Sequence, residues 1–208
     1  MLKKEFNFLE PFSTAMGSLK FNNSETRVKC FGVDSSNNPI ASKNVEVLFY
    51  NSEDDFAIKL KTKEGEEVIL YKTTGENKTF EENYQEIKKQ QSNYSGKAIF
   101  GKTDMLRIPF IKVNDEINYD ELCGREIKNS KYYIKQALQT IDFELNNVGG
   151  SVKSEAVIDS AMNDENENVR KMIFDSDFIL YLKEENKEQP YFALKVDNTD
   201  ILVPNNLD

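Results

Sequence analysis

The chain has 208 residues, 38% of them hydrophobic and 30% charged, and a formal net charge of −9 at pH 7. That length and apolar content are sufficient for one folded domain over residues 1–208 with a substantial core. The acidic balance argues against nucleic acid or an anionic membrane surface as a partner, because both bind basic protein faces. The sequence contains no histidine, which excludes histidine-based triads, general bases and metal ligands.

Targeting signals and cysteines indicate which cellular compartment the protein occupies. No apolar run approaches the ~20 residues that span a bilayer. The N-terminus, Met1-Leu-Lys-Lys-Glu-Phe6, has no apolar stretch typical of a signal peptide. If Met1 is the natural start, we therefore expect a cytoplasmic protein. Two isolated cysteines, Cys30 and Cys123, are more often free and buried in such a chain, and a disulfide between them is the alternative.

The first third of the chain alternates short apolar segments with turns. Lys3–Phe12 carries three phenylalanines, and Leu19–Val33 indicates two short strands. Further strands are expected at Val45–Tyr50 and Phe56–Leu60, with Val68–Tyr71 as a candidate extension of the same set. The pattern predicts a β-rich N-terminal region.

The clearest helix is predicted over Phe80–Gln91. Its apolar residues fall at helical spacing, and Thr79 with Glu82 forms the pattern of a capping box. Met105–Val113 reads as a strand that contains Pro109. Because proline cannot donate to a ladder, we expect this strand at a sheet edge or at a bulge.

The stretch from Ile134 to Asn198 organises the rest of the chain. Within it, apolar residues alternate with polar ones over residues 141–146, which is the period of a half-buried strand. Gly149 and Gly150 then give the backbone freedom to bend. The following polar segment, Ser151–Lys171, contains neither glycine nor proline. This order predicts a strand, a hinge and a long exposed connection.

Two dense apolar runs follow that connection. Phe178–Leu182 and Tyr191–Val196 are separated by the polar segment 183–190. Runs of this length and spacing predict a buried antiparallel hairpin.

In this order the segments resemble the C-terminal region of the serpins, protease inhibitors with a mobile reactive-centre loop. Phe143-Glu-Leu-Asn-Asn-Val-Gly-Gly150 resembles the strand that enters the family's hinge, with Asn147-Val148 where an acidic pair is usual. Phe174-Asp-Ser-Asp-Phe-Ile-Leu-Tyr181 resembles the pattern Phe-x-x-Asp-x-Pro-Phe-Leu-Phe, and Tyr191-Phe-Ala-Leu-Lys-Val-Asp-Asn198 the closing Leu-Phe-Met-Gly-x-Val-x-Asn. Residues 3–12, 105–113 and 119–124 resemble further serpin segments.

The resemblance covers residues from about Lys3 to Asn198, but only the C-terminal half of a serpin. It implies an α+β fold of predominantly antiparallel serpin-type sheets with a few short helices, lacking the family's N-terminal helical half. It also implies that the chain is not an enzyme and needs no cofactor. A serpin acts as a suicide substrate of a serine or cysteine protease, and the protease supplies the chemistry.

The same resemblance implies a limit on inhibition. The cleaved loop of a serpin inserts into a large sheet that opens between two neighbouring strands, and we expect that one of these strands is not encoded here. The chain alone is therefore expected not to inhibit. A non-inhibitory protein–protein interaction module on the same scaffold is the alternative function.

The resemblance assigns a reactive-centre-type loop to about residues 149–171, with Gly149 and Gly150 as its hinge. Family spacing puts the bait bond near Asn163-Asp164. In strand alternation one face of this segment is small or apolar, as an inserting strand requires. That face consists of Gly150, Val152, Ser154, Ala156 and Ile158. The alternative is an ordinary exposed connection, with a short helix over Ser154–Met162.

Acidic clusters offer the remaining candidate chemistry. Asp164-Glu-Asn-Glu-Asn168 partly imitates a calcium loop, but Val169 replaces the glycine of its sharp turn, so we expect no metal. Glu53–Asp55 and Glu64–Glu67 pair carboxylates in strongly polar stretches, and we interpret both as surface loops. No nucleophile motif accompanies them.

Overall fold

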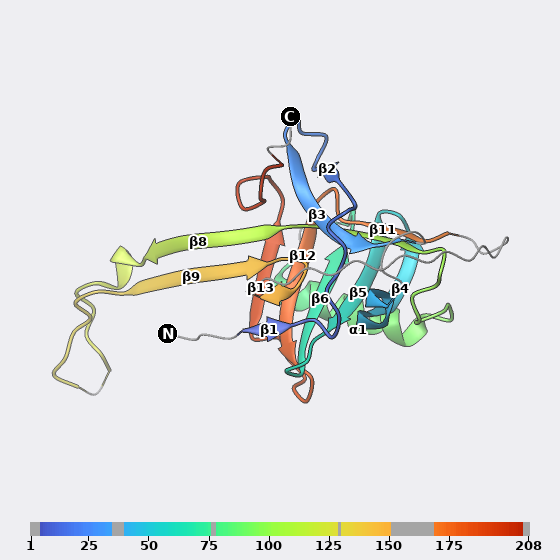
Figure 1. Cartoon of the computed structure of the whole chain (residues 1–208). Coiled ribbons are helices and arrows are strands. Elements are labelled where there is room, and N and C mark those ends of the chain that lie inside the picture. Colours follow the sequence, from blue (N-terminus) through green and yellow to red (C-terminus); the bar gives the residue numbers. More distant parts are fainter. Residues whose placement is uncertain (1–4, 35–39, 76–77, 129, 151–168, 206–208) are drawn as a thin grey trace.

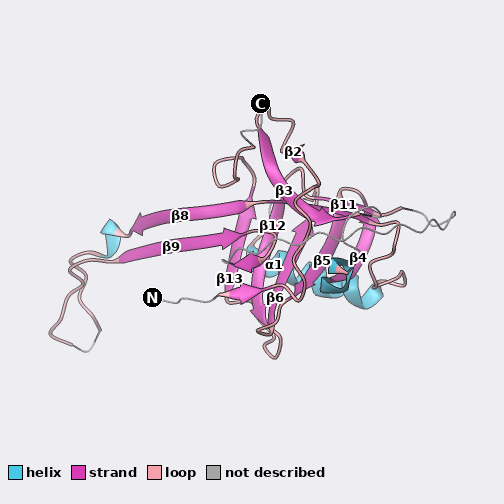
Figure 2. Cartoon of the chain, viewed as in Figure 1, coloured by secondary structure: helices cyan, strands magenta, loops and turns pink. Residues whose placement is uncertain are grey.

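The computed structural model describes residues 5–34, 40–75, 78–128, 130–150 and 169–205. These residues form mainly antiparallel strands with one α-helix (Figure 1, Figure 2), which confirms the predicted α+β class. In chain order the elements are β1 (Phe6–Asn7), β2 (Ser18–Lys20), β3 (Arg27–Val33), η1 (Ala41–Asn44), β4 (Val45–Ser52), β5 (Asp55–Lys61), β6 (Glu66–Lys72), α1 (Phe80–Asn93), β7 (Met105–Pro109), β8 (Ile111–Asn118), η2 (Asp120–Leu122), β9 (Leu138–Leu145), β10 (Gly149–Gly150), β11 (Lys171–Ile173), β12 (Phe178–Glu184) and β13 (Phe192–Val196).

A five-stranded antiparallel sheet with the order β13-β12-β6-β5-β4 forms the centre of the fold (Figure 1). β12 pairs with β13 from Phe178 opposite Val196 to Leu182 opposite Phe192, which confirms the predicted hairpin. β6 pairs with the other side of β12, so its apolar run extends the same sheet. One face packs on the main core and the other on α1. Because both faces are covered, the strands read as nearly continuous apolar runs.

The helix α1 begins where the sequence predicts. The hydroxyl of Thr79 accepts a hydrogen bond from the Glu82 N–H at 3.2 Å, and the Glu82 carboxylate accepts one from the Thr79 N–H at 2.8 Å. This reciprocal pair is a capping box. Tyr84 and Ile87 are buried in the cluster between the helix and the sheet. The apolar spacing that predicted the helix is therefore the spacing that seats it.

A second sheet, ordered β11-β7-β3-β2, contributes to the same main core. Phe31 of β3 lies in an aromatic cluster with Phe8 and Phe12, at centroid distances of 6.2 and 5.6 Å. The neighbouring Gly32 allows β3 to approach β7, because a Cβ there would lie 1.8 Å from the Leu106 carbonyl oxygen. The N-terminal phenylalanines are thus core residues of the fold.

The expectation for Pro109 was wrong in its detail. Pro109 is the last residue of β7, which is an inner strand of its sheet and not an edge strand. The position tolerates proline because β11 pairs only with residues 105–107, so among the described residues one side of Pro109 faces no strand. The chain leaves this sheet at Phe110 and continues as β8 in another.

β8 and β9 form a two-stranded antiparallel ribbon. Ile111 lies opposite Leu145 and Val113 opposite Phe143, which confirms the strand predicted from the alternation over residues 141–146. The inner end of the ribbon packs on the body, where the ring of Phe143 lies 5.1 Å from that of Phe192. The outer end projects away from the rest of the chain (Figure 1).

Candidate functional site

The chain reverses direction directly after β9, at the predicted hinge. Two backbone hydrogen bonds of 3.1 and 3.3 Å join Asn146 and Gly149 and close a two-residue turn. The side chain of Asn146 supports this turn by accepting a hydrogen bond from the Val148 N–H at 2.9 Å. Gly149 and Gly150 therefore start back along β9 as β10.

β10 follows β9 through this turn and pairs with β1. Phe6 of β1 pairs with Gly150, and the pairing continues where the Phe8 N–H donates to the Val148 carbonyl at 2.8 Å. Gly149 has a φ of +132°, and a Cβ there would lie 2.4 Å from the carbonyl oxygen of Phe6. Both the backbone conformation and the close approach of β1 therefore require glycine at the first hinge position.

This arrangement bears on one expectation, that a strand bordering an insertion slot is not encoded in the chain. Among the described residues, β1 pairs with the predicted hinge over Phe6–Asn7. A strand of two residues has no periodicity, so it could not be predicted from the pattern of residues. In the described part of the chain the pairing beside the predicted hinge is only two residues long.

The other end of the loop segment is held by Arg170, directly before β11. Its guanidinium donates to both carboxylate oxygens of Asp104, with a shortest distance of 2.5 Å. It also donates to the carbonyls of Lys97 and Ile99 at 2.6 and 2.8 Å and to the hydroxyl of Tyr94 at 3.3 Å. Asp104 is only 3% exposed. A charged pair with this geometry and burial fixes the backbone at Arg170.

The charge of this anchor is permanent. Burial by itself would lower the pKa of Arg170, but the hydrogen bond and the charge of Asp104 outweigh it and raise the pKa. Sequence analysis missed both residues, because they are 66 positions apart and neither belongs to a motif. The only available signal was a cation at the boundary between a polar segment and an apolar run.

A second buried cation holds the chain just after β11. Lys72 of β6 is 3% exposed, and its Nζ donates to the Ile173 carbonyl at 3.1 Å and to the Asp175 carboxylate at 2.7 Å. The same Nζ pairs with Asp54 at 3.1 Å. Arg170 and Lys72 therefore anchor β11 at both of its ends.

Part of the predicted site lies outside the described residues. This applies to the bait bond at Asn163 and Asp164, the acidic stretch 164–168 and the alternative helix over 154–162. Of the predicted site residues, the structure describes Gly149 and Gly150 and brings them against β1. Within the described ranges, no group of three or more His, Cys, Asp or Glu residues is arranged to hold a metal ion.

The interpretation of residues 64–67 as a surface loop was wrong for its second half. Glu66 and Glu67 lie in β6, and Glu66 is 8% exposed. The hydroxyl of Tyr191 donates to the Glu66 carboxylate at 2.9 Å. Strand residues in a short polar stretch cannot be recognised from the sequence, because a strand end and a turn can have the same composition.

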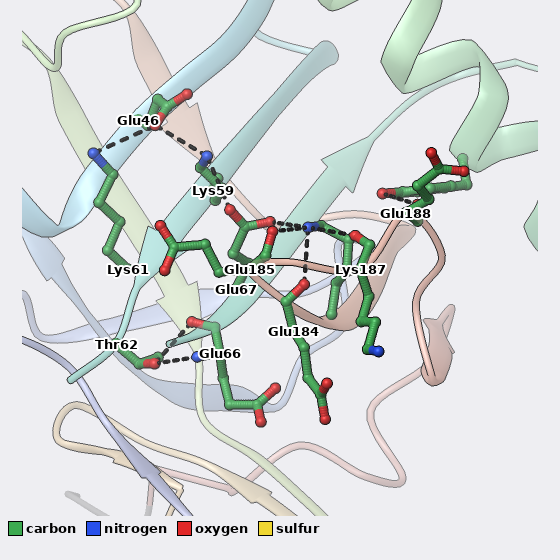
Figure 3. Close-up of polar contacts among 12 residues, drawn as sticks. Glu46, Lys59, Lys61, Thr62, Glu66, Glu67, Glu184, Glu185, Lys187 and Glu188 are labelled. Atoms are coloured by element: carbon green, nitrogen blue, oxygen red, sulfur yellow. Dashed lines mark hydrogen bonds and ion pairs between the residues drawn. The ribbon is translucent and has the colours of Figure 1, made fainter. Parts of the chain in front are cut away.

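Glu67 belongs to a row of alternating charges across four strands (Figure 3). The row joins Glu46 to Lys59 at 3.1 Å, Lys59 to Glu67 at 3.2 Å, and Glu67 to Lys183 at 2.6 Å. Burial by itself would lower the pKa of Lys59, but the charge of Glu67 and the hydrogen bond to Glu46 outweigh it and raise the pKa. The charges neutralise one another, which is typical of a stabilising cross-strand network.

The two cysteines agree in part with the expectation that they are free and buried. Cys30 and Cys123 are both free, but Cys123 is exposed and not buried. Burial raises the pKa of the Cys30 thiol.

No helix among the described residues is long and apolar enough to cross a bilayer.

The fold is similar to solved serpin structures. A highly specific serpin of the insect Tenebrio molitor has 15% sequence identity and a TM-score of 0.58 over 92% of this chain and 52% of its own. Human kallistatin has 12% identity and a TM-score of 0.60 over 92% and 52%. A serpin of the trematode Schistosoma haematobium has 12% identity and a TM-score of 0.58 over 95% and 55%. The sequence itself matches no protein-family model and no curated protein.

These similarities define a serpin-like fold. The chain spans about half the length of the serpins it matches. Its mostly antiparallel sheets correspond to the serpin fold without the helical N-terminal half, as the sequence resemblance implied.

Proposed function

We propose that the chain is a serpin-type binding protein whose segment 149–171 is presented to a serine or cysteine protease. In this role the chain is not an enzyme and carries no catalytic residue. Gly149 and Gly150 act as the hinge, and Asn163 and Asp164 flank the bait bond. The 208-residue polypeptide is bound and cut by the protease but does not trap it.

The observation that carries this proposal is the turn between Asn146 and Gly149, which directs β10 back along β9. If pairing continued past Gly150 in the same register, Val152 would lie opposite Phe143 and Ser154 opposite Ile141. The small or apolar face of the segment would then match the apolar face of β9. A sequence selected only as an exposed connection has no reason to satisfy this register.

A second observation favours the alternative of a non-inhibitory interaction module. In the uncut chain β10 already pairs with β1, and among the described residues this pairing extends over two residues only. A cleaved loop would gain few further backbone partners from a pairing of that length. On this alternative, the segment binds a protein partner that does not cut it.

The two functions are separated by incubation with serine and cysteine proteases, followed by mass spectrometry and denaturing electrophoresis. We expect first cleavage within residues 151–168, near Asn163, and no covalent adduct. Replacing Asn163 and Asp164 by alanine should weaken binding of an active-site-inactivated protease about tenfold. The matched control replaces Glu81 and Gln85, an exposed hydrogen-bonded pair near the start of α1 that contacts no described residue of the segment, and should not change binding.

Absence of cleavage in 151–168 by every protease of both classes would leave only the interaction module. A covalent adduct that survives denaturation would instead show that the polypeptide traps its target, and the statement that it does not would be wrong.

A further inference from the structure

The outer end of the β8–β9 ribbon carries a hairpin, here called the tip and defined by the described residues 125–128 and 130–135. The N–H of Ile127 donates to the Tyr132 carbonyl at 2.9 Å, and the N–H of Ile134 donates to the Arg125 carbonyl at 2.9 Å. Below them, the N–H of Gly124 donates to the Ile134 carbonyl at 2.8 Å. These backbone hydrogen bonds continue the ribbon into the described residues of the tip.

The tip is basic in an otherwise acidic chain. It contains Arg125, Lys128, Lys131 and Lys135 against one carboxylate, Glu126, a net charge of +3, whereas the whole chain carries −9. In the part of the chain that the structure describes, the three lysines form no ion pair. Four of the buried or half-buried cations of the body, Lys59, Lys72, Arg170 and Lys183, are by contrast paired with carboxylates. The charge of the tip is thus available to a partner.

The tip also exposes large hydrophobic side chains. Ile127, Tyr132 and Tyr133 are 48%, 74% and 65% exposed, and they are three of only nine such residues in the described ranges. Because Tyr132 and Tyr133 are consecutive in an extended segment, they lie on opposite faces of the hairpin. A partner that covers both must surround the end of the ribbon.

The ribbon separates the tip from the acidic body. Asn114 to Asn118 leave the body as extended strand, which at ~3.4 Å per residue corresponds to about 17 Å. The Debye length in physiological salt is about 8 Å, so the charge of the body is largely screened at the tip. The carboxylates of Asp115, Glu116, Asp120 and Glu121 lie on the ribbon, on the body side of the tip, and Arg125 donates to the Glu121 carbonyl at 2.8 Å. The argument from net charge therefore holds for the body and the ribbon, and only an end-on approach presents the basic tip ahead of these carboxylates.

We propose that the tip is a docking surface for the headgroup layer of an anionic lipid bilayer, which it enters end-on. Lysine and arginine are attracted to anionic headgroups, and tyrosine is favoured at the boundary between headgroups and hydrocarbon. A fluid headgroup layer surrounds an inserted hairpin on all sides and needs no complementary groove. The contact is peripheral and leaves the acidic body in water.

The test is co-sedimentation of the full chain with vesicles of phosphatidylcholine, with and without about one-third phosphatidylserine. We expect binding only to the anionic vesicles, and its loss in about 0.5 M salt, where the Debye length is roughly 4 Å. Lys128→Glu with Lys131→Glu should reduce the partition coefficient at least about tenfold. Tyr132→Ser with Tyr133→Ser should reduce it about threefold and in a salt-independent manner.

The matched control, Lys20→Glu with Lys102→Glu, changes the net charge equally on exposed lysines outside the tip and should leave binding unchanged. Far-UV circular dichroism with thermal melting shows whether each variant folds. The proposal is overturned if the native chain does not bind anionic vesicles at low salt, or if the control reduces binding as much as the tip variant. Binding to an acidic polypeptide or to nucleic acid, but not to vesicles, would also overturn it.

Discussion

The two ends of the segment between Gly150 and Arg170 are held by different interactions. At the entering end, Asn146 to Gly150 are held mainly by backbone hydrogen bonds to β1 and within a two-residue turn. At the leaving end, Arg170 and Lys72 hold the chain by side-chain ion pairs with Asp104 and Asp175. The entering end is held by uncharged backbone hydrogen bonds, and the leaving end is held by two ion pairs.

The difference indicates which end can change. A backbone ladder extends or shortens by one residue at a time, and each step costs little because the next pair resembles the last. A buried ion pair has no intermediate arrangement, and separating it exposes an uncompensated charge. Any rearrangement of the segment should therefore begin at Gly149 and Gly150, while Arg170 stays in place.

The largest expected effect follows from removing the cation of the ion pair between Arg170 and Asp104. Arg170→Met leaves the carboxylate of Asp104 buried without its partner, and we expect a loss of about 3 kcal/mol in the free energy of unfolding. Urea denaturation followed by fluorescence or circular dichroism measures it. A loss below about 0.5 kcal/mol, the size typical of an exposed ion pair, would show that the leaving end is not fixed in this way.

A double variant sharpens this result. Asp104→Leu combined with Arg170→Met removes both charges, so it should be less destabilised than Arg170→Met alone, because no unpaired charge remains buried. If the two effects simply added, the two side chains would be energetically independent despite their contact.

A smaller effect is expected at the entering end. Gly149→Ala should cost about 2 kcal/mol, because φ is +132° and the new Cβ would meet the Phe6 carbonyl oxygen at 2.4 Å. Gly17 is the matched control, since it has a φ of +78° but no atom within 4 Å of an added Cβ. Gly17→Ala should therefore cost about 1 kcal/mol from backbone strain alone. Equal losses in the two variants would show that β1 does not press against the hinge.

The sequence was sufficient to predict the elements whose residue pattern lies within a short stretch of the chain. The capping box at Thr79 predicted the start of α1, and the alternation around Phe143 predicted β9. The hairpin of β12 and β13 followed from two apolar runs with a short polar connection. In each of these, neighbours in sequence are neighbours in space, so periodicity and capping reveal them.

The features that sequence reasoning missed depend on partners that are distant in the chain. Asp104 and Arg170 carry no local pattern, and β1 is a strand only because Gly149 and Gly150 return to it. Glu66 and Glu67 resemble a polar turn in sequence, and only the neighbouring strands show that they are partly enclosed. No composition argument distinguishes such residues from a solvated surface.

The smallest expected effect concerns cleavage of the segment itself. In a serpin that traps proteases, cleavage lets the loop join a sheet and raises thermal stability. Here β10 already pairs with β1, and in the described part of the chain that pairing covers only Phe6 and Asn7. An added strand that paired with β9 alone beyond these residues would have a neighbour on one side, and such a strand is weakly held. We therefore expect that a single cut near Asn163 leaves the melting temperature unchanged or lower, measured by differential scanning calorimetry of the intact and the cut chain. A rise of more than about 4 °C, which corresponds to about 1 kcal/mol or more for a chain of this size, would show that the cut loop adds a stabilising strand. The turn between Asn146 and Gly149 would then direct the cut loop into a sheet. The main argument for a non-inhibitory interaction module would no longer hold.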